Sequence, residues 1–188
     1  MTKCRRADDK LYNLIQFNKV PNLKTSDFKE IVNYNNDINL CFTNEKRKLI
    51  NYYKMRVLNA KNHWKGGIKL KELPYDKRTQ DVILHKVVPI MSKVNSEEID
   101  LVNNQRFVIT KVGAIQITIQ DDSGMERNIF THEFQKYFLV AYATTIHSSQ
   151  GMSIGKNYTI HEWDRLDQKL KYVALSSARD HELSHIMK

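Results

Sequence analysis

Residues 38–53, INLCFTNEKRKLINYY, contain the pattern that decides the fold class. Ile38, Leu40 and Phe42 recur at every second position as in a short strand, and the polar pair Thr43 and Asn44 follows at once. The apolar spacing of a helix then continues to residue 53. A strand, a polar turn and a helix in this order form the α/β unit that places functional groups at the carboxyl end of a strand. We therefore predict an α/β domain with a parallel sheet.

The rest of the chain divides into segments of different character. We predict a helix around Leu11 and Leu14 that ends at Pro21, and a second helix that Ser26 or Asp27 caps. Residues 137–142 and 158–160 have the apolar character of buried strands. Residues 168–175 fit either a last strand or the start of a helix, and a solvated helix is predicted at the C-terminus.

The middle of the chain predicts an insertion. Residues 61–85 are rich in lysine and fit an exposed basic loop or insertion. Ile115, Ile117 and Ile119 then alternate with polar residues, and the turn sequence DDSG at 121–124 follows. We therefore predict a small antiparallel β-barrel at 86–136, between a first segment at 1–60 and a last segment at 137–188 of the parallel-sheet domain.

Charge and composition narrow the class of protein. The 188 residues include 30 Lys and Arg against 21 Asp and Glu, a formal net charge of +9, which favours a polyanionic partner. A lysine-rich composition is also what codon bias toward A and T would produce. The sequence has no apolar run long enough for a membrane span and no signal peptide at its start. We therefore expect no membrane partner. Two cysteines cannot form a disulfide scaffold, so we expect a reducing, intracellular location.

Two short motifs imitate known sites. Residues 181–185, HELSH, have the spacing of a zinc-binding helix with His181, Glu182 and His185, but no later segment can supply a third ligand. A zinc hydrolase is therefore the function that the sequence supports least, and we predict no metal site. Residues 151–157, GMSIGKN, imitate a phosphate loop, but one residue is missing between the glycines and Asn157 follows the lysine.

Two further strings carry a resemblance to a known family. Residues 141–152, AYATTIHSSQGM, and residues 172–179, YVALSSAR, resemble motifs V and VI of superfamily-one helicases of the RecD/Dda-like branch. Weaker matches are KCRR at 3–6 for motif IV, CFTN at 41–44 with Asn51 for the opening of a second RecA-like domain, and residues 88–107 for the approach to an inserted SH3-like barrel. The resemblance implies the C-terminal half of such a helicase. A viral source is compatible with it, and the location would then be the host cytoplasm or nucleus.

The resemblance also implies an activity. This half would belong to an ATP-dependent DNA helicase that moves 5′-to-3′ on single-stranded DNA. ATP and Mg²⁺ would be held mainly by an N-terminal RecA-like domain with a phosphate loop, and this chain alone would not hydrolyse ATP. The alternative is a non-catalytic module, derived from a helicase, that binds a single strand. RNA in place of DNA stays open.

Site residues follow from the matched motifs. Arg6 would reach the γ-phosphate. Ser177 occupies the position of the arginine finger, so either Arg179 substitutes for it, or ATP turnover is impaired, or the finger comes from elsewhere. Gln150 and Gly151 would face the nucleotide. Short donors at strand ends suit phosphate oxygens of any base sequence, and they predict nucleic-acid contacts at Thr43, Asn44, Thr144, Thr145, His147 and Ser149.

Overall fold

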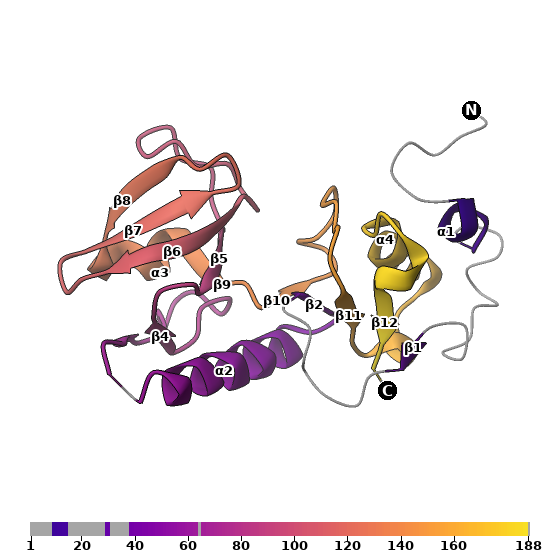
Figure 1. The fold of residues 1–188 in the computed structure, drawn as a ribbon, viewed down its shortest axis with the longest axis horizontal. Coiled ribbons are helices and arrows are strands. Elements are labelled where there is room, and N and C mark those ends of the chain that lie inside the picture. The colour runs from indigo at the N-terminus through magenta and orange to yellow at the C-terminus, as the bar shows by residue number, and fades with distance from the viewer. Residues whose placement is uncertain (1–8, 15–28, 31–37, 64, 188) are drawn as a thin grey trace. The chain divides into compact units, whose positions relative to one another are not determined.

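A computed structural model describes residues 9–14, 29–30, 38–63 and 65–187, and the chain forms two compact units (Figure 1). Unit 1 comprises Met1–Arg47 and Ala143–Lys188, and unit 2 comprises Lys48–Tyr142. Unit 2 is therefore an insertion in the chain of unit 1.

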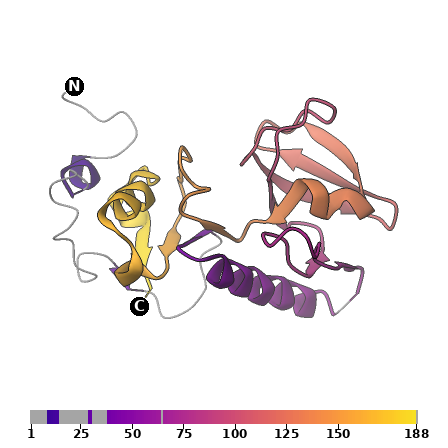
Figure 2. The ribbon, with the colours of Figure 1, turned by 180° about the vertical axis from the view of Figure 1, so that it is seen from behind.

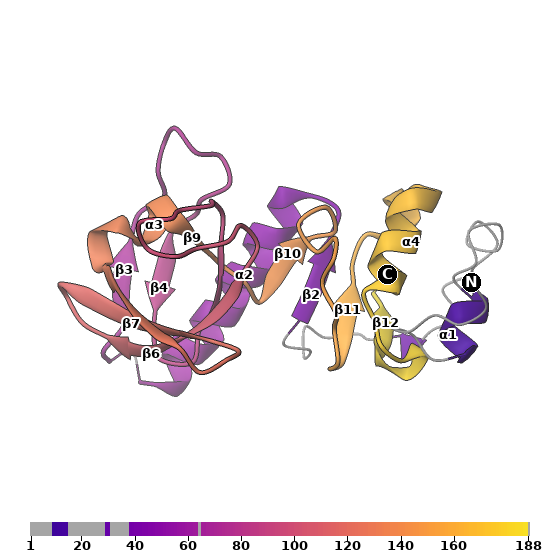
Figure 3. The ribbon, with the colours of Figure 1, turned by 90° about the horizontal axis from the view of Figure 1, so that it is seen from above.

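Unit 1 is built on a five-stranded sheet in the order β1-β12-β11-β2-β10, in which every recorded pair is parallel. Its strands are β1 (Lys29–Glu30), β2 (Ile38–Cys41), β10 (Ala143–Thr145), β11 (Tyr158–Ile160) and β12 (Ser184–Ile186). Figure 3 shows β10, β2, β11 and β12 side by side. The predicted α/β class with a parallel sheet is confirmed.

Helix α4 (Gln168–Ser176) packs on this sheet, as the yellow helix in Figure 2 shows. Asp167 caps its start by accepting a hydrogen bond from the Leu170 amide at 2.7 Å. Leu170, Ala174 and Leu175 are buried in one apolar cluster with the strands, which also includes Leu11 of α1 (Asp9–Leu14). The open choice for residues 168–175 is thus settled as a helix.

Two predicted helices of unit 1 are wrong where the structure describes them. Lys29 and Glu30 lie in β1, because the edge of β12 offers them parallel pairing that outweighs local helix preference. The C-terminal segment forms one 3-10 turn, η5 (His181–Leu183), and then β12, which is buried between β1 and β11. Pairing with two neighbouring strands again decides the conformation.

Unit 2 contains most of α2 (Asn44–Lys61), a hairpin and an antiparallel sheet. The hairpin pairs β3 (Ile68–Leu70) with β4 (Val82–Leu84), so the segment at 61–85 contains two strands as well as loop. The sheet has the order β8-β7-β6-β5-β9. Its strands are β5 (Pro89–Ser92), β6 (Arg106–Val112), β7 (Gln116–Asp121), β8 (Glu126–Phe130) and β9 (Phe138–Val140), with η3 (Thr131–Glu133) and α3 (Phe134–Tyr137) before β9. Closure into an SH3-like barrel stays a prediction.

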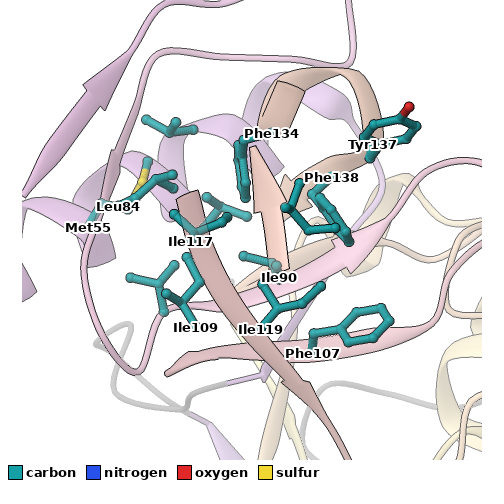
Figure 4. Packing of buried hydrophobic residues seen from close by; sticks show 14 of the residues in the cluster. Met55, Leu84, Ile90, Phe107, Ile109, Ile117, Ile119, Phe134, Tyr137 and Phe138 are labelled. Atoms are coloured by element: carbon teal, nitrogen blue, oxygen red, sulfur yellow. The ribbon is translucent and has the colours of Figure 1, made fainter. Parts of the chain in front are cut away.

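The core of unit 2 is apolar (Figure 4). The Phe138 ring lies 5.8 Å from the rings of both Phe107 and Phe134. Ile117 and Ile119 of β7 face this cluster, so the alternation seen in the sequence marks the buried side of the sheet. No helix among the described residues is long and apolar enough to cross a membrane.

Candidate nucleic-acid interface

Three neighbouring strands of unit 1 end at the same edge. β10 and β11 lie on either side of β2, with Thr145 paired to Cys41 and Ile160 paired to Leu40. Because all three strands are parallel, the segments that follow them begin at the carboxyl edge of the sheet. This edge carries the turn Thr43-Asn44, the loop at 146–152 and the pair His161-Glu162. We call it the carboxyl edge of unit 1.

The loop after β10 is held by its own polar groups. Thr145 Oγ1 accepts a hydrogen bond from the Ser148 amide at 3.3 Å and lies 3.0 Å from Ser148 Oγ. Thr144 and Ser149 are buried, and their hydroxyls donate to the carbonyl oxygens of Thr145 and Ile146 at 3.1 and 2.9 Å. These hydroxyls therefore shape the loop in this structure.

The same loop directs other predicted residues outward. His147, Gln150 and Gly151 are exposed, and Thr145 is half-buried. Gly151 has a φ of +88°, a conformation that suits glycine at this turn. The side chains at 147 and 150 are thus accessible to a ligand at the carboxyl edge.

The turn after β2 begins helix α2. Thr43 acts as its cap, since Thr43 Oγ1 accepts from the Lys46 amide at 3.2 Å and the Thr43 carbonyl accepts from the Arg47 amide at 3.2 Å. Asn44 is exposed, and its Oδ1 accepts a hydrogen bond from Arg47 Nε at 3.1 Å. Thr43 and Asn44 therefore lie at the predicted edge, with Asn44 the more accessible.

Glu162 is a residue of this edge that the sequence analysis missed. Its Oε2 accepts from the amides of Phe42 and Thr43 at 3.0 and 2.9 Å, and its Oε1 accepts from Thr43 Oγ1 at 3.0 Å. Arg165 Nη1 lies 2.7 Å from Oε1. Burial alone would raise the pKa of this carboxyl, but the donors from residues 42 and 43 and the nearby guanidinium outweigh it and lower the pKa below its ordinary value.

One signal for Glu162 was available in the sequence. The residue comes two positions after the strand 158–160, and polar groups that follow a parallel strand lie at the functional edge. Its left-handed backbone, with φ 58° and ψ 35°, could not be inferred, because glutamate rarely adopts that conformation.

His161 has a structural environment. Its ring is buried, and Nε2 lies 2.9 Å from Oδ1 of Asn39 in β2. Burial, with a smaller contribution from Lys46, lowers the pKa of His161 to about 4. The imidazole is therefore neutral near pH 7, with Nε2–H as the donor to the amide oxygen.

The motif VI segment places its two candidate residues differently. Ser177 follows α4, is buried, and donates its hydroxyl to the Val173 carbonyl at 3.0 Å. Arg179 is exposed, and its amide donates to the Ile154 carbonyl at 3.2 Å. Its side chain passes Gly155, where an added Cβ would lie 3.7 Å from Arg179 Cδ. Arg6, the other predicted catalytic residue, lies outside the described residues.

The zinc-like motif lacks the helix that its chemistry needs. His185 lies in β12, is buried, and its Nδ1 is 3.1 Å from the Leu183 carbonyl. Within the described part of the chain, no group of three or more His, Cys, Asp or Glu side chains could hold a metal ion. Burial raises the pKa of the Cys41 thiol to about 12, so this thiol is protonated and unreactive.

The positive charge of the lysine-rich segment at 61–85 is partly offset by acidic residues of the same segment. Lys71 Nζ lies 2.7 Å from Asp81, and Arg78 Nε lies 3.1 Å from Asp76. Asp76 also pairs with the buried ammonium of Lys93. These pairs offset part of the positive charge of this segment.

Comparisons with solved structures identify the fold. The chain is similar to a Pif1 helicase structure that describes DNA unwinding at forked DNA by two coordinating Pif1 helicases, with a TM-score of 0.70 and 20% identity over 97% of this chain and 48% of that one. It is similar to Bacteroides Pif1 bound to single-stranded DNA, with a TM-score of 0.69 and 20% identity over 98% of this chain and 50% of that one. It is also similar to Candida albicans Pif1, with a TM-score of 0.66 and 14% identity over 96% and 53%.

These likenesses show that the chain shares the fold of about half of each Pif1 structure that it matches. Unit 1 is thus a RecA-like domain, as predicted. The chain spans about half the length of the solved structures it matches. No protein-family model matches the sequence, and no curated protein matches it.

Proposed function

We propose that this chain is the C-terminal motor part of an ATP-dependent helicase and that the carboxyl edge of unit 1 binds single-stranded DNA. One observation carries the proposal: two polar segments, at 43–44 and 145–151, lie at one edge of a sheet with the fold of Pif1 helicases, one of which is bound to single-stranded DNA. DNA is favoured over RNA by this likeness alone.

The chemistry of the edge suits a phosphate backbone. Asn44, Thr145 and His147 offer small uncharged or weakly basic donors, and such groups contact phosphate oxygens without selecting a base. The net charge of +9 adds long-range attraction for any polyanion. Affinity should therefore depend on salt and little on base sequence.

The residues proposed to contact the nucleotide are Gln150, Gly151 and Arg179, and all three are exposed. A guanidinium at 179 would neutralise charge that develops on a transferred phosphoryl group. ATP and Mg²⁺ would be held mainly by an N-terminal RecA-like domain with a phosphate loop, a motif that this sequence does not contain. Some Pif1 structures of similar fold are complexes with ADP-AlF₄ or ADP-AlF₃. We propose 5′-to-3′ movement for the complete motor from the motif resemblance.

One observation favours the alternative of a non-catalytic binding module. Ser177, which stands at the arginine-finger position, is buried and directs its hydroxyl into its own helix. It can stabilise no phosphoryl charge there, so either Arg179 acts in its place or the finger comes from elsewhere if the motor hydrolyses ATP.

The binding claim is tested by titrating fluorescent oligothymidine with the chain at low and moderate salt. Thr145→Ala/His147→Ala should weaken binding about 10-fold, because two contacts of about 0.5–1.5 kcal/mol each are lost. The matched control Thr118→Ala/His132→Ala removes the same residue types from unit 2 and should leave affinity unchanged. Equal affinity for both double variants and the wild type would contradict the proposal.

Catalysis is tested by joining the chain to a RecA-like domain with a phosphate loop. The helicase proposal predicts DNA-stimulated ATP hydrolysis that Arg179→Ala reduces at least about 1,000-fold, the lower end of an arginine finger's contribution. Gly155→Ala, next to the same guanidinium, serves as the control and should retain hydrolysis. Tight DNA binding without hydrolysis would establish the binding module instead.

A further inference from the structure

The carboxylate of Glu162 organises the turn at the end of β2. Its two oxygens take three donors from Phe42 and Thr43, at 2.9–3.0 Å. Only 11% of the side-chain surface of Glu162 is exposed. Arg165 contacts Oε1 of Glu162 at 2.7 Å, and its guanidinium carbon lies 5.4 Å from the centre of the Phe42 ring. The carboxylate thus fixes the backbone where β2 passes into α2.

Because of these contacts, Thr43 cannot be the main donor to a ligand. Its amide and its hydroxyl proton both point at Glu162, and its hydroxyl oxygen accepts from Lys46. A hydroxyl has only one proton to donate. The donor that this turn can offer to a phosphate therefore comes from the next residue.

That residue is Asn44, and its amide orientation follows from its partner. Arg47 Nε is a donor only, so the side-chain oxygen of Asn44 must face it, at 3.1 Å. The Nδ2 group of this exposed side chain then points away from Arg47. Glu162 sets the backbone of the turn, and Arg47 sets the amide within it.

We propose that Glu162 is a positioning residue that holds the Thr43 turn so that Asn44 Nδ2 meets a phosphate of the bound strand. The inference rests on the proposed single-strand binding at the carboxyl edge of unit 1. In this proposal Asn44 makes the phosphate contact at this turn. Glu162 strengthens the binding of an anion although it is itself acidic.

The sign of the effect separates this role from simple electrostatics. Removing a negative charge near a phosphate site should tighten binding if the carboxylate acts only through its charge. Removing a positioning carboxylate should weaken binding, because the donor it orients is lost. Glu162→Gln keeps the size of the side chain and removes the charge, so the two roles predict opposite changes.

The experiment measures oligothymidine affinity of the full chain for wild type, Glu162→Gln, Asn44→Ala and the double variant. Glu162→Gln should weaken binding about 3- to 10-fold, the value of one hydrogen bond. In the Asn44→Ala background the same change should have no further effect, since Glu162 acts through Asn44. Asp164→Asn removes an exposed carboxylate two residues away and should bind as tightly as wild type or slightly more tightly.

Three results would overturn the inference. These are binding by a folded Glu162→Gln protein that equals or exceeds the wild type, full additivity with Asn44→Ala, and a wild-type Asn44 side-chain amide resonance that does not shift when oligothymidine is added. The resonance measurement needs no variant and applies even if Glu162→Gln is unstable. Failure of the proposed function differs: the wild type itself would then show no binding that Thr145→Ala/His147→Ala weakens.

Discussion

Unit 1 and unit 2 use their buried positions differently. Unit 1 buries Asn39 in β2, Thr159 in β11 and His161 directly after β11. The sheet of unit 2 packs on a large aliphatic and aromatic cluster, and buried hydrogen bonds such as Asn51 Nδ2 to the Val140 carbonyl and Gln135 Nε2 to the Gln80 carbonyl join its segments. Both units have an apolar core and buried hydrogen bonds, but only in unit 1 do such bonds lie beside the candidate site. The two units should therefore respond to different perturbations.

The largest effect is expected from a cavity in unit 2. Phe138→Ala removes a fully buried ring that contacts Phe107 and Phe134. The free energy of unfolding should fall by about 3–5 kcal/mol, measured by urea denaturation. Ile115→Ala, at a side chain that is 75% exposed, should change it by less than about 0.5 kcal/mol. A loss below about 1 kcal/mol at Phe138 would contradict the assigned core.

Acid should weaken unit 1 through His161. Its pKa is about 4 in the folded state, below the ordinary value, so the unfolded chain binds the proton first as the pH falls. Stability is then lost between about pH 6.5 and pH 4, by on the order of 3 kcal/mol in full. Urea midpoints at pH 7, 5.5 and 4.5 measure this loss, and His161→Gln should flatten it. An equal flattening in the control His132→Gln, an exposed histidine of unit 2, would contradict the assignment.

The sequence predicted the two units unequally. The alternation of Ile117 and Ile119 with polar residues marked unit 2 as antiparallel, because one face of each strand meets water, whereas Ile115 lies before β7 and is exposed. The three residues of β12 are all buried, so this strand has no such pattern, and both β12 and the two-residue β1 were predicted as helix. Long-range pairing decides both, and no local feature shows it.

The candidate site was predicted in position more than in detail. Polar residues after strands located the carboxyl edge from the sequence alone. The sequence could not show that Thr144 and Ser149 direct their hydroxyls to main-chain oxygens, or that Glu162 takes the donors of Thr43. These assignments depend on loop geometry that forms only when the three strands lie together.

A smaller loss is expected from a buried hydroxyl in unit 1. Tyr158 Oη lies 2.9 Å from both the Ala174 carbonyl and Ser184 Oγ, and so joins β11 to α4 and β12. Tyr158→Phe should lower the free energy of unfolding by about 1–2 kcal/mol, since the buried Ala174 carbonyl loses its donor and Ser184 Oγ loses its partner. Thermal unfolding measures the difference in stability between this variant and the wild type. The control is Tyr75→Phe, at an exposed tyrosine. No difference would show that apolar packing dominates in unit 1 as well.

The smallest effect is expected from the ion pairs that Asp76 of unit 2 forms with Arg78 and Lys93. Burial opposes ionisation of Asp76, but hydrogen bonds from Arg78 and Lys93 outweigh it and hold the pKa of the carboxyl below its ordinary value. A depressed folded-state pKa stabilises above the unfolded value, so this contribution is lost as the pH falls below about 4. We expect about 1 kcal/mol, reduced by solvent screening, from urea unfolding between pH 5 and pH 2. Asp76→Asn should show a shallower dependence than wild type, and an identical slope would contradict the pair.

The central claim is that single-stranded DNA binds at the carboxyl edge of unit 1. Hydrogen exchange of the chain with and without oligothymidine tests it most directly. The account predicts slower exchange in peptides that cover residues 42–46 and 145–152, with residues 65–78 of unit 2 unchanged. Protection confined to residues 65–78, with none at the carboxyl edge, would contradict it.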